Sequence, residues 1–332
     1  MPTLPVPIFS SLVLGFLLVR IVLVDRRHGA LAALLALCAV QGVVIALVQH
    51  YGVSGMRPAQ AILAACIPPM AWVAFQATAV RGLKGRDAAH LLAPGSALLG
   101  FLVWPSGLDV LIPALFVFYG GAILWVSTRG PDALPRLRLG EGALPGLIWT
   151  IIGASLIGSA LSDVLIIAVM AFGADEWRPW IISIYSSAML LLVGGLSLSG
   201  ALNVSASEPE EADPNPPQAT EQDAAIVARL DALMRQERLY LDPDLTLTRL
   251  ARRLVLPVKQ VSAAVNKVTG ENVSRYINAA RIAAAQEALG AGESVTQAML
   301  ASGFSTKSNF NREFLRITGA APRDWRAAQA GR

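Results

Sequence analysis

Four side chains near the end of the chain have the chemistry of a DNA-reading surface. The stretch "GFSTKSNFNREF", residues 303–314, begins as a tight turn and continues with the spacing of a short helix. Lysine and arginine can donate to the O6 and N7 atoms of guanine, and asparagine can make a two-point contact with adenine. The stretch carries these residue types at Lys307, Asn309, Asn311 and Arg312. It therefore predicts a helix that reads bases in the major groove.

The elements around this stretch follow helical spacing from residue 223 onward. Apolar residues recur every three to four positions, which is typical of helices that bury one face. A short helix, a turn and a second helix occur twice, and one long helix over about residues 273–289 joins the two copies. These are the proportions of a helix-turn-helix unit. We expect the two units at residues 246–268 and 294–317.

This arrangement resembles the DNA-binding domain of the AraC/XylS family of transcription regulators. The stretches that carry the resemblance are "LTLTRLARRL", "VSAAVNKVTGENVSRYIN", "RIAAAQEAL" and "SGFSTKSNFNREFLRITGAAPRDWR". In the last stretch, the matching residues are Gly303, Phe304, Ser308, Phe310, Arg312, Phe314, Gly319, Pro322 and Arg326. The resemblance covers about 100 of the 332 residues. It implies an all-α double helix-turn-helix domain that binds specific operator or promoter DNA.

The resemblance also implies which residues contact DNA, because in this family the second helix of each unit enters the major groove. The matching positions are Lys259, Ser262, Ala263, Lys307, Ser308, Asn309, Asn311 and Arg312. Two residues depart from the family's pattern. Ala263 stands where many relatives have a long polar side chain, and Met299 replaces a small residue before the second turn. Whether both units read bases equally therefore stays open.

The charge distribution favours the same partner. Residues 223–332 hold 16 Lys/Arg and 10 Asp/Glu, whereas all five charged residues in 203–222 are acidic. Attraction between such cations and DNA phosphates supplies most of the non-specific affinity. A solubilising surface is the alternative interpretation of the same cations. Residues 203–222 are Pro-rich and lack apolar periodicity, so we expect a disordered acidic linker before the DNA-binding domain.

Residues 1–202 have the composition of a membrane domain. The chain is 54% hydrophobic and 15% charged, whereas soluble proteins are about 25% charged. Only 11 of its 27 Lys/Arg and 8 of its 23 Asp/Glu lie in this part. A helix needs about 20 apolar residues to cross a membrane. Seven runs approach that length, which predicts a seven-helix transmembrane bundle: 5–24, 30–50, 59–80, 88–104, 109–128, 143–172 and 179–201.

The loops between these runs carry an uneven distribution of positive charge. Those after the first, third and fifth runs hold Arg26, Arg27, Arg81, Lys84, Arg86, Arg129, Arg136 and Arg138. The alternate loops hold Arg57 and Arg178. Because positive loops face the cytoplasm, the pattern predicts an amino terminus outside the cell. Seven crossings would then leave the DNA-binding domain in the cytoplasm, so we expect a multi-pass protein of the bacterial cytoplasmic (inner) membrane.

Asp163, within the sixth run, is a candidate for a ligand site in the membrane domain. Carboxylates inside a membrane are costly and often functional. The alternative is a carboxylate that is wetted or hydrogen-bonded near the outer end of its helix. On the same run, Ala154, Gly158 and Ser162 recur at every fourth position, which favours close helix packing. The two cysteines and three histidines lie apart, so the sequence predicts no metal site and no cofactor.

These features favour a membrane-tethered, one-component transcription regulator with no enzymatic activity. Its expected partners are double-stranded operator DNA, the lipid bilayer, a second copy of the chain, RNA polymerase, and an unknown small-molecule or envelope signal. A homodimer would double the number of recognition helices on the duplex. Two alternatives stay open. One is a membrane transporter or enzyme with an auxiliary DNA-binding domain, and the other is a constitutively anchored DNA-binding protein.

Overall fold

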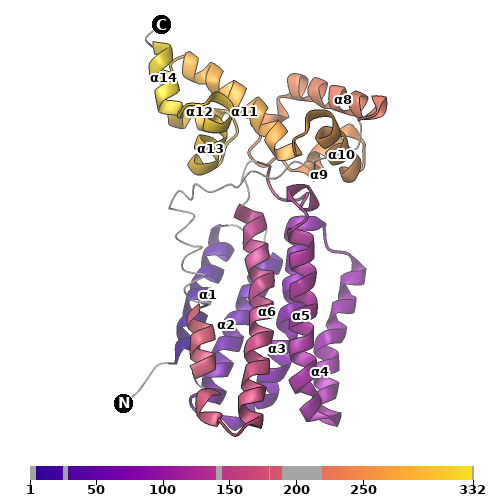
Figure 1. Cartoon of the computed structure of the whole chain (residues 1–332), viewed down its shortest axis with the longest axis vertical. Coiled ribbons are helices and arrows are strands. Elements are labelled where there is room, and N and C mark those ends of the chain that lie inside the picture. Colours follow the sequence, from indigo (N-terminus) through magenta and orange to yellow (C-terminus); the bar gives the residue numbers. More distant parts are fainter. Residues whose placement is uncertain (1–4, 25–28, 140–143, 179, 189–218, 331–332) are drawn as a thin grey trace. The chain divides into compact units, whose positions relative to one another are not determined.

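The computed structural model describes residues 5–24, 29–139, 144–178, 180–188 and 219–330. Within these ranges the chain is helical, apart from turns and one isolated bridge between Arg138 and Thr246. The expected all-α fold is thus confirmed. The chain divides into two compact units, whose helices are labelled in Figure 1. The first unit consists of Met1–Thr128 and Leu147–Ala201, and the second of Arg129–Gly146 and Leu202–Arg332.

The first unit consists largely of apolar helices. They are α1 (Val6–Val24), α2 (Gly29–Gln49), α3 (Arg57–Phe75), α4 (Leu92–Val103), α5 (Leu108–Ser127) and most of α6 (Leu144–Ala171). Large apolar side chains remain exposed on several of them. Phe16, Val110 and Phe118 are 69%, 72% and 68% exposed. Exposed apolar surface of this extent is unusual in a soluble protein and suits contact with lipid.

Five stretches are long and apolar enough to cross a membrane: Val6–Leu23, Gly29–Gln49, Ser54–Val80, Pro105–Ser127 and Pro145–Ala171. They correspond to the expected first, second, third, fifth and sixth runs. The expected fourth run differs, because a 3-10 helix precedes an α4 of only 12 residues. Pro94 favours the start of a helix at this point, since a proline is tolerated in the first turn. The expected seventh run, 179–201, lies largely outside the described residues, so the seven-span count stays a prediction.

Helices α5 and α6 approach each other closely at two glycines. A Cβ atom on Gly120 would lie 2.8 Å from the carbonyl oxygen of Gly153, and one on Gly153 would lie 3.0 Å from that of Gly120. Close approach at small residues is typical of membrane helices. The small-residue face expected from Ala154 does not form this contact, because Ala154 is exposed. Gly158 of that face lies near the ring of Tyr185 instead.

The second unit has two apolar cores that share one helix. Its helices are α8 (Glu221–Glu237), α9 (Leu247–Leu254), α10 (Val258–Thr269), α11 (Val273–Gly290), α12 (Val295–Ala301), α13 (Lys307–Thr318) and α14 (Pro322–Ala330). Val273 and Ile277 of α11 pack with α8, α9 and α10, while Ile282 and Leu289 pack with α12 and α13. Within this unit, Figure 1 shows α11 between the two groups of helices. The sequence-based pair of helix-turn-helix units is therefore present.

Local sequence explains where these helices begin and end. Thr246, Asn272 and Ser294 are N-caps whose side chains accept hydrogen bonds from the first turns of α9, α11 and α12. Such caps satisfy backbone donors that have no partner within the helix. Helices α10 and α13, the second helices of the two helix-turn-helix units, each end at a glycine in the left-handed region, Gly270 with φ 71° and Gly319 with φ 73°. Glycine favours this conformation because it has no Cβ atom.

The second unit departs from the expected domain boundaries at two places. Helix α8 begins at Glu221, two residues before the expected start of the domain, because Thr220 and Asp223 form a capping box. Residues 203–218, most of the expected linker, lie outside the described part of the chain. The larger departure is that Arg129–Gly146 belongs to this unit, although residues 1–202 were expected to form the membrane domain.

Candidate nucleic-acid interface

Helix α13 is positioned by a tight turn and an aromatic core. The chain turns at Gly303, which has φ 83°, and α13 begins at Lys307. Phe304 and Phe310 are buried, and their rings meet edge to face with centroids 5.3 Å apart. Because Phe310 fixes the inner face of α13, Lys307 and Ser308 lie exposed at its first turn. Recognition helices commonly contact base edges with this part of the helix.

Asn309 differs from the other expected base contacts on α13. Its side chain is 4% exposed, and its Oδ1 accepts a hydrogen bond from Nη2 of Arg312. The reason is its position on the helix, one residue before buried Phe310 and four before buried Glu313. Asn309 is therefore placed to orient Arg312 rather than to present its own amide at the surface. Asn311 and Arg312 are half-buried.

Glu313 also contributes to this surface, although it was not among the residues expected from the sequence. It is 4% exposed, yet it accepts hydrogen bonds from Arg312 at 3.3 Å and from Arg316 at 3.0 Å. Arg316 also pairs with Glu271 at 3.1 Å. A buried carboxylate between two guanidinium groups limits where each of them can point. The available signal was the three-residue spacing of Glu313 and Arg316, which brings side chains together on a helix.

Helix α10 presents Lys259 and Ala263 at the surface, as expected. Ser262 is half-buried, and its Oγ donates a hydrogen bond of 2.5 Å to Oδ2 of Asp132. Asp132 lies in the chain between α5 and α6, far from α10 in sequence. Ser262, an expected base contact of the first helix-turn-helix unit, is thus already hydrogen-bonded to a carboxylate.

The last turn of α10 is bound to the first turn of α8 through Lys267 and Asp223. Lys267 Nζ lies 3.1 Å from Oδ2 of Asp223. The backbone N–H of Thr220 donates to the same carboxylate at 3.0 Å, and the Thr220 hydroxyl donates at 2.8 Å. All three bonds lower the pKa of Asp223 below its ordinary value. The Thr220 N–H has the largest effect, followed by the Thr220 hydroxyl and then Lys267. The position of α10 therefore depends on α8.

Arg281 connects the two halves of this unit. It is fully buried, with Nε donating to the carbonyl oxygen of Tyr240 at 2.6 Å and Nη2 donating to that of Asp242 at 2.8 Å. Its guanidinium lies 5.6 Å from the ring centre of Phe304, within the range of a cation–π contact. The first half supplies the two carbonyls and the second supplies the ring, so Arg281 limits changes in the angle between the recognition helices.

Comparison with protein families gives a match to a helix-turn-helix domain over residues 250–328. That range contains α10 to α13 with both turns and every expected base contact. This part of the chain is an AraC-type helix-turn-helix domain. The match supports sequence-specific DNA binding by an AraC-type regulator, with DNA as the partner. Among curated proteins and among solved structures, no match to the chain was found.

The AraC-type domain has an additional component outside the matched residues. Leu139 is 7% exposed and belongs to the same apolar core as Leu245 and Leu247. The available signal was the recurrence of leucine in "LPRLRL", residues 134–139. The arginines in that stretch are equally typical of a solvated cytoplasmic loop, so the sequence alone did not distinguish the two.

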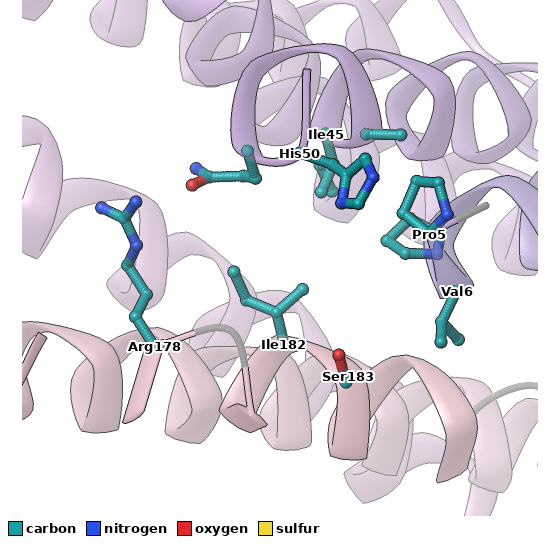
Figure 2. Close-up of a pocket in the computed structure, with 10 residues that line it drawn as sticks. Pro5, Val6, Ile45, His50, Arg178, Ile182 and Ser183 are labelled. Atoms are coloured by element: carbon teal, nitrogen blue, oxygen red, sulfur yellow. The ribbon is translucent and has the colours of Figure 1, made fainter. Parts of the chain in front are cut away.

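A hollow of about 270 Å³ lies among the helices of the first unit (Figure 2). Its lining includes Val6, Ile45, Gln49, His50, Arg178 and Ile182. Figure 2 shows Arg178 and Ile182 on one side of the hollow, with Ile45 of α2 and His50, which follows α2, on the other. Apolar walls with a guanidinium, an imidazole and an amide at hand suit a small organic anion.

Asp163, the expected ligand-binding residue of the membrane domain, does not line this hollow. It is half-buried on α6. In the part of the chain that the structure describes, no group of three or more His, Cys, Asp and Glu side chains lies together as a metal site would require.

Proposed function

We propose that this chain is a membrane-tethered, one-component transcription regulator that binds operator DNA through its AraC-type domain. The observation that carries the proposal is the presence, in one chain, of that domain and of five helices long and apolar enough to cross a membrane. Lys307 and Ser308 at the start of α13, with Lys259 and Ala263 on α10, supply exposed groups for base and phosphate contacts.

The chain segments that make up the second unit support a cytoplasmic location for the AraC-type domain. Residues 129–146 belong to that unit, and the same residues connect α5 to α6. A segment packed on a domain lies on the same side of the membrane as the domain. Because Arg129, Arg136 and Arg138 make the segment positively charged, the positive-inside bias assigns it to the cytoplasm. This support does not depend on how many spans the chain has.

The hollow in the first unit is the candidate site for a sensed signal. Arg178 and His50 would bind the charged part of a small organic anion, and Ile45 and Ile182 would contact its apolar part. A ligand that binds one arrangement of these helices more tightly than another would shift their population. In this proposal the regulator acts on DNA as a homodimer, with RNA polymerase as a further partner.

The central test is whether the full-length chain occupies specific chromosomal sites. DNA cross-linked to the chain in cells should be enriched in a common sequence, and Arg312→Ala should weaken that enrichment and relax the common sequence at one position. Arg86→Ala is the matched control, since Arg86 is an exposed cation of the membrane unit. A reporter enzyme fused after Arg332 should be active only in the cytoplasm. Activity outside the cell, or capture of DNA without any common sequence, would contradict the proposal.

Transcription from a bound promoter separates sensing from constitutive anchoring. Arg178→Ala should alter the response of that promoter, whereas Arg57→Ala, which removes an exposed cation outside the hollow, should not. An unchanged response with both variants would favour a constitutively anchored DNA-binding protein. A substrate transported or converted by a chain with Arg312→Ala would favour the transporter or enzyme alternative.

A further inference from the structure

Residues 132–139, named here the docking segment, are bound to the first helix-turn-helix unit although more than a hundred positions separate the two in sequence. The carbonyl oxygen of Pro135 accepts hydrogen bonds from the backbone N–H of Thr248 at 3.0 Å and from its hydroxyl at 2.9 Å. Thr248 lies in the first turn of α9, where backbone donors have no partner within the helix. The docking segment therefore completes the start of α9.

The end of the docking segment is fixed more tightly. The Leu139 N–H donates to the carbonyl oxygen of Leu245 at 3.0 Å, and the Ser274 hydroxyl donates to that of Leu139 at 2.7 Å. The Leu139 side chain is buried in the apolar core of this unit. The ion pair of Arg138 and Asp244, 3.1 Å apart, is 40% and 47% exposed, and exposed pairs contribute little. Hydrogen bonds to its backbone and the buried Leu139 side chain therefore hold the segment on this unit.

The beginning of the docking segment reaches the expected DNA-binding face of α10. Oδ2 of Asp132 accepts the 2.5 Å hydrogen bond from Ser262. Ser262 lies between Lys259 and Ala263 in sequence, and both of these expected DNA contacts are exposed. A carboxylate at this position occupies the serine hydroxyl and repels the phosphates of an approaching duplex. The docked Asp132 and DNA therefore compete for the same surface.

We propose that the docking segment is an autoinhibitory latch on the first helix-turn-helix unit, an inference that rests on the proposed function in DNA binding. With Asp132 bound to Ser262, the first helix-turn-helix unit is blocked, and only the second helix-turn-helix unit can contact bases. The latch continues into α5 on one side and α6 on the other. A rearrangement of either helix that withdraws Asp132 would expose α10, which gives the membrane unit a direct route to the DNA-binding surface.

The contacts divide the latch into an anchor and a blocking group. Pro135 and Leu139 form the anchor, because they supply the backbone bonds and the buried side chain. Asp132 is the blocking group, since its carboxylate meets the recognition helix. Replacing Asp132 should therefore change DNA binding without disturbing the core, whereas Leu139→Ala would disturb the core itself.

The first experiment measures the affinity of the full-length chain, in lipid nanodiscs, for duplexes selected from a random pool. Asp132→Asn keeps the size of the side chain and removes its charge. We expect its Kd for DNA to be roughly tenfold lower than that of the wild type. Asp109→Asn, which removes an exposed carboxylate of the membrane unit, is the matched control and should leave the Kd unchanged. Circular dichroism checks that both variants keep the wild-type helical content.

The second experiment closes the latch covalently. Asp132→Cys combined with Ser262→Cys places two thiols where the carboxylate and hydroxyl meet. Oxidation to the disulfide should weaken DNA binding at least about tenfold relative to the reduced form, and reduction should restore it. Each single-cysteine variant controls for Cys38 and Cys66. If the disulfide does not form, the affinity of Asp132→Asn decides.

The outcomes separate the latch from the function on which it rests. A Kd that is the same for the wild type, Asp132→Asn and both redox states would overturn the latch and leave DNA binding intact. Failure of every form to bind any selected duplex, with normal helical content, would overturn the proposed function and the latch with it. Tighter binding by Asp132→Asn together with weaker binding by the disulfide form supports both.

Discussion

Gly303 packs directly against the backbone of Tyr240. A Cβ atom on Gly303 would lie 2.7 Å from the Tyr240 carbonyl oxygen, the same oxygen that accepts the hydrogen bond from Arg281. The turn of the second helix-turn-helix unit is thus pressed onto the chain that leads into the first. Together with buried Arg281, this contact sets the relation between the two recognition helices.

Gly303→Ala should therefore destabilise the AraC-type domain by about 2–4 kcal/mol. The alanine would meet a carbonyl oxygen and would also adopt φ 83°. Gly292→Ala is a matched control, because Gly292 has φ 93° but nothing within 4 Å of an added Cβ. It should cost about 1 kcal/mol from backbone strain alone. Hydrogen exchange of α11 amides in the full-length chain measures both, and equal losses would contradict the packing argument.

Arg312→Ala should reduce specific DNA affinity by about 1–3 kcal/mol and relax the choice of base at one position. Asn309→Ala should have the same effect in a weaker form, because Asn309 holds the guanidinium of Arg312 without being exposed itself. Selection of duplexes on each variant measures the change. Loss of sequence choice with Asn309→Ala but not with Arg312→Ala would show that Asn309 reads a base directly.

Lys307→Ala should weaken binding by a similar factor on all sequences if Lys307 contacts phosphate. Its side chain is exposed at the first turn of α13. Each lost phosphate contact reduces the slope of log K against log salt by about 1. Titrations at several salt concentrations test this, with Arg86→Ala as the control of equal charge. An unchanged slope with a changed base preference would assign Lys307 to base reading instead.

The junction of α8 and α10 should lose stability in acid. Because the pKa of Asp223 is lowered below 3.8 in the folded chain, its bonds to Thr220 and Lys267 contribute stability above that value. The contribution should be lost as the pH falls through the lowered pKa. The protection factors of α8 amides, which compare their exchange with that of free peptides at the same pH, should therefore fall below about pH 4. Asp223→Asn should lack this pH dependence, whereas Asp324→Asn on α14 should retain it.

Gly120→Ala should weaken the packing of α5 on α6 by about 1–3 kcal/mol. Its Cβ atom would lie 2.8 Å from the carbonyl oxygen of Gly153, and helix backbones cannot separate there without losing their contacts. Gly121→Ala, at the next position of the same helix, would meet nothing within 4 Å and should be neutral. The fraction of protein that stays monodisperse in detergent after heating compares the two. Equal loss from both would place the crossing elsewhere.

Much of the fold followed from local patterns. Apolar spacing predicted the helices on both sides of each turn. Thr246, Asn272 and Ser294 are residue types that favour the N-cap position, and each one precedes the first residue of a helix. Of the seven apolar runs predicted to span a membrane, five correspond to described stretches that are long and apolar enough to do so. The run 88–104, already short and interrupted by Pro94, was the exception, since its α-helix has only 12 residues.

Four of the DNA contacts predicted from sequence are exposed in the structure: Lys259, Ala263, Lys307 and Ser308. Asn309 was predicted as a base contact, whereas its side chain is only 4% exposed, because a residue near the edge of a buried sector can turn either way. Its partner Arg312 and the core around Phe310 decide which.

The sequence by itself determined the helices, their caps, the two helix-turn-helix units and the separation of an apolar from a basic part. Each of these depends on residues within a few turns of one another, where spacing and residue type suffice. Only the tertiary structure brought Pro135 to Thr248, which lies 113 positions away, and Asp132 to Ser262, 130 positions away. Such contacts depend on which surfaces fit once the helices have packed, and no local spacing encodes that fit.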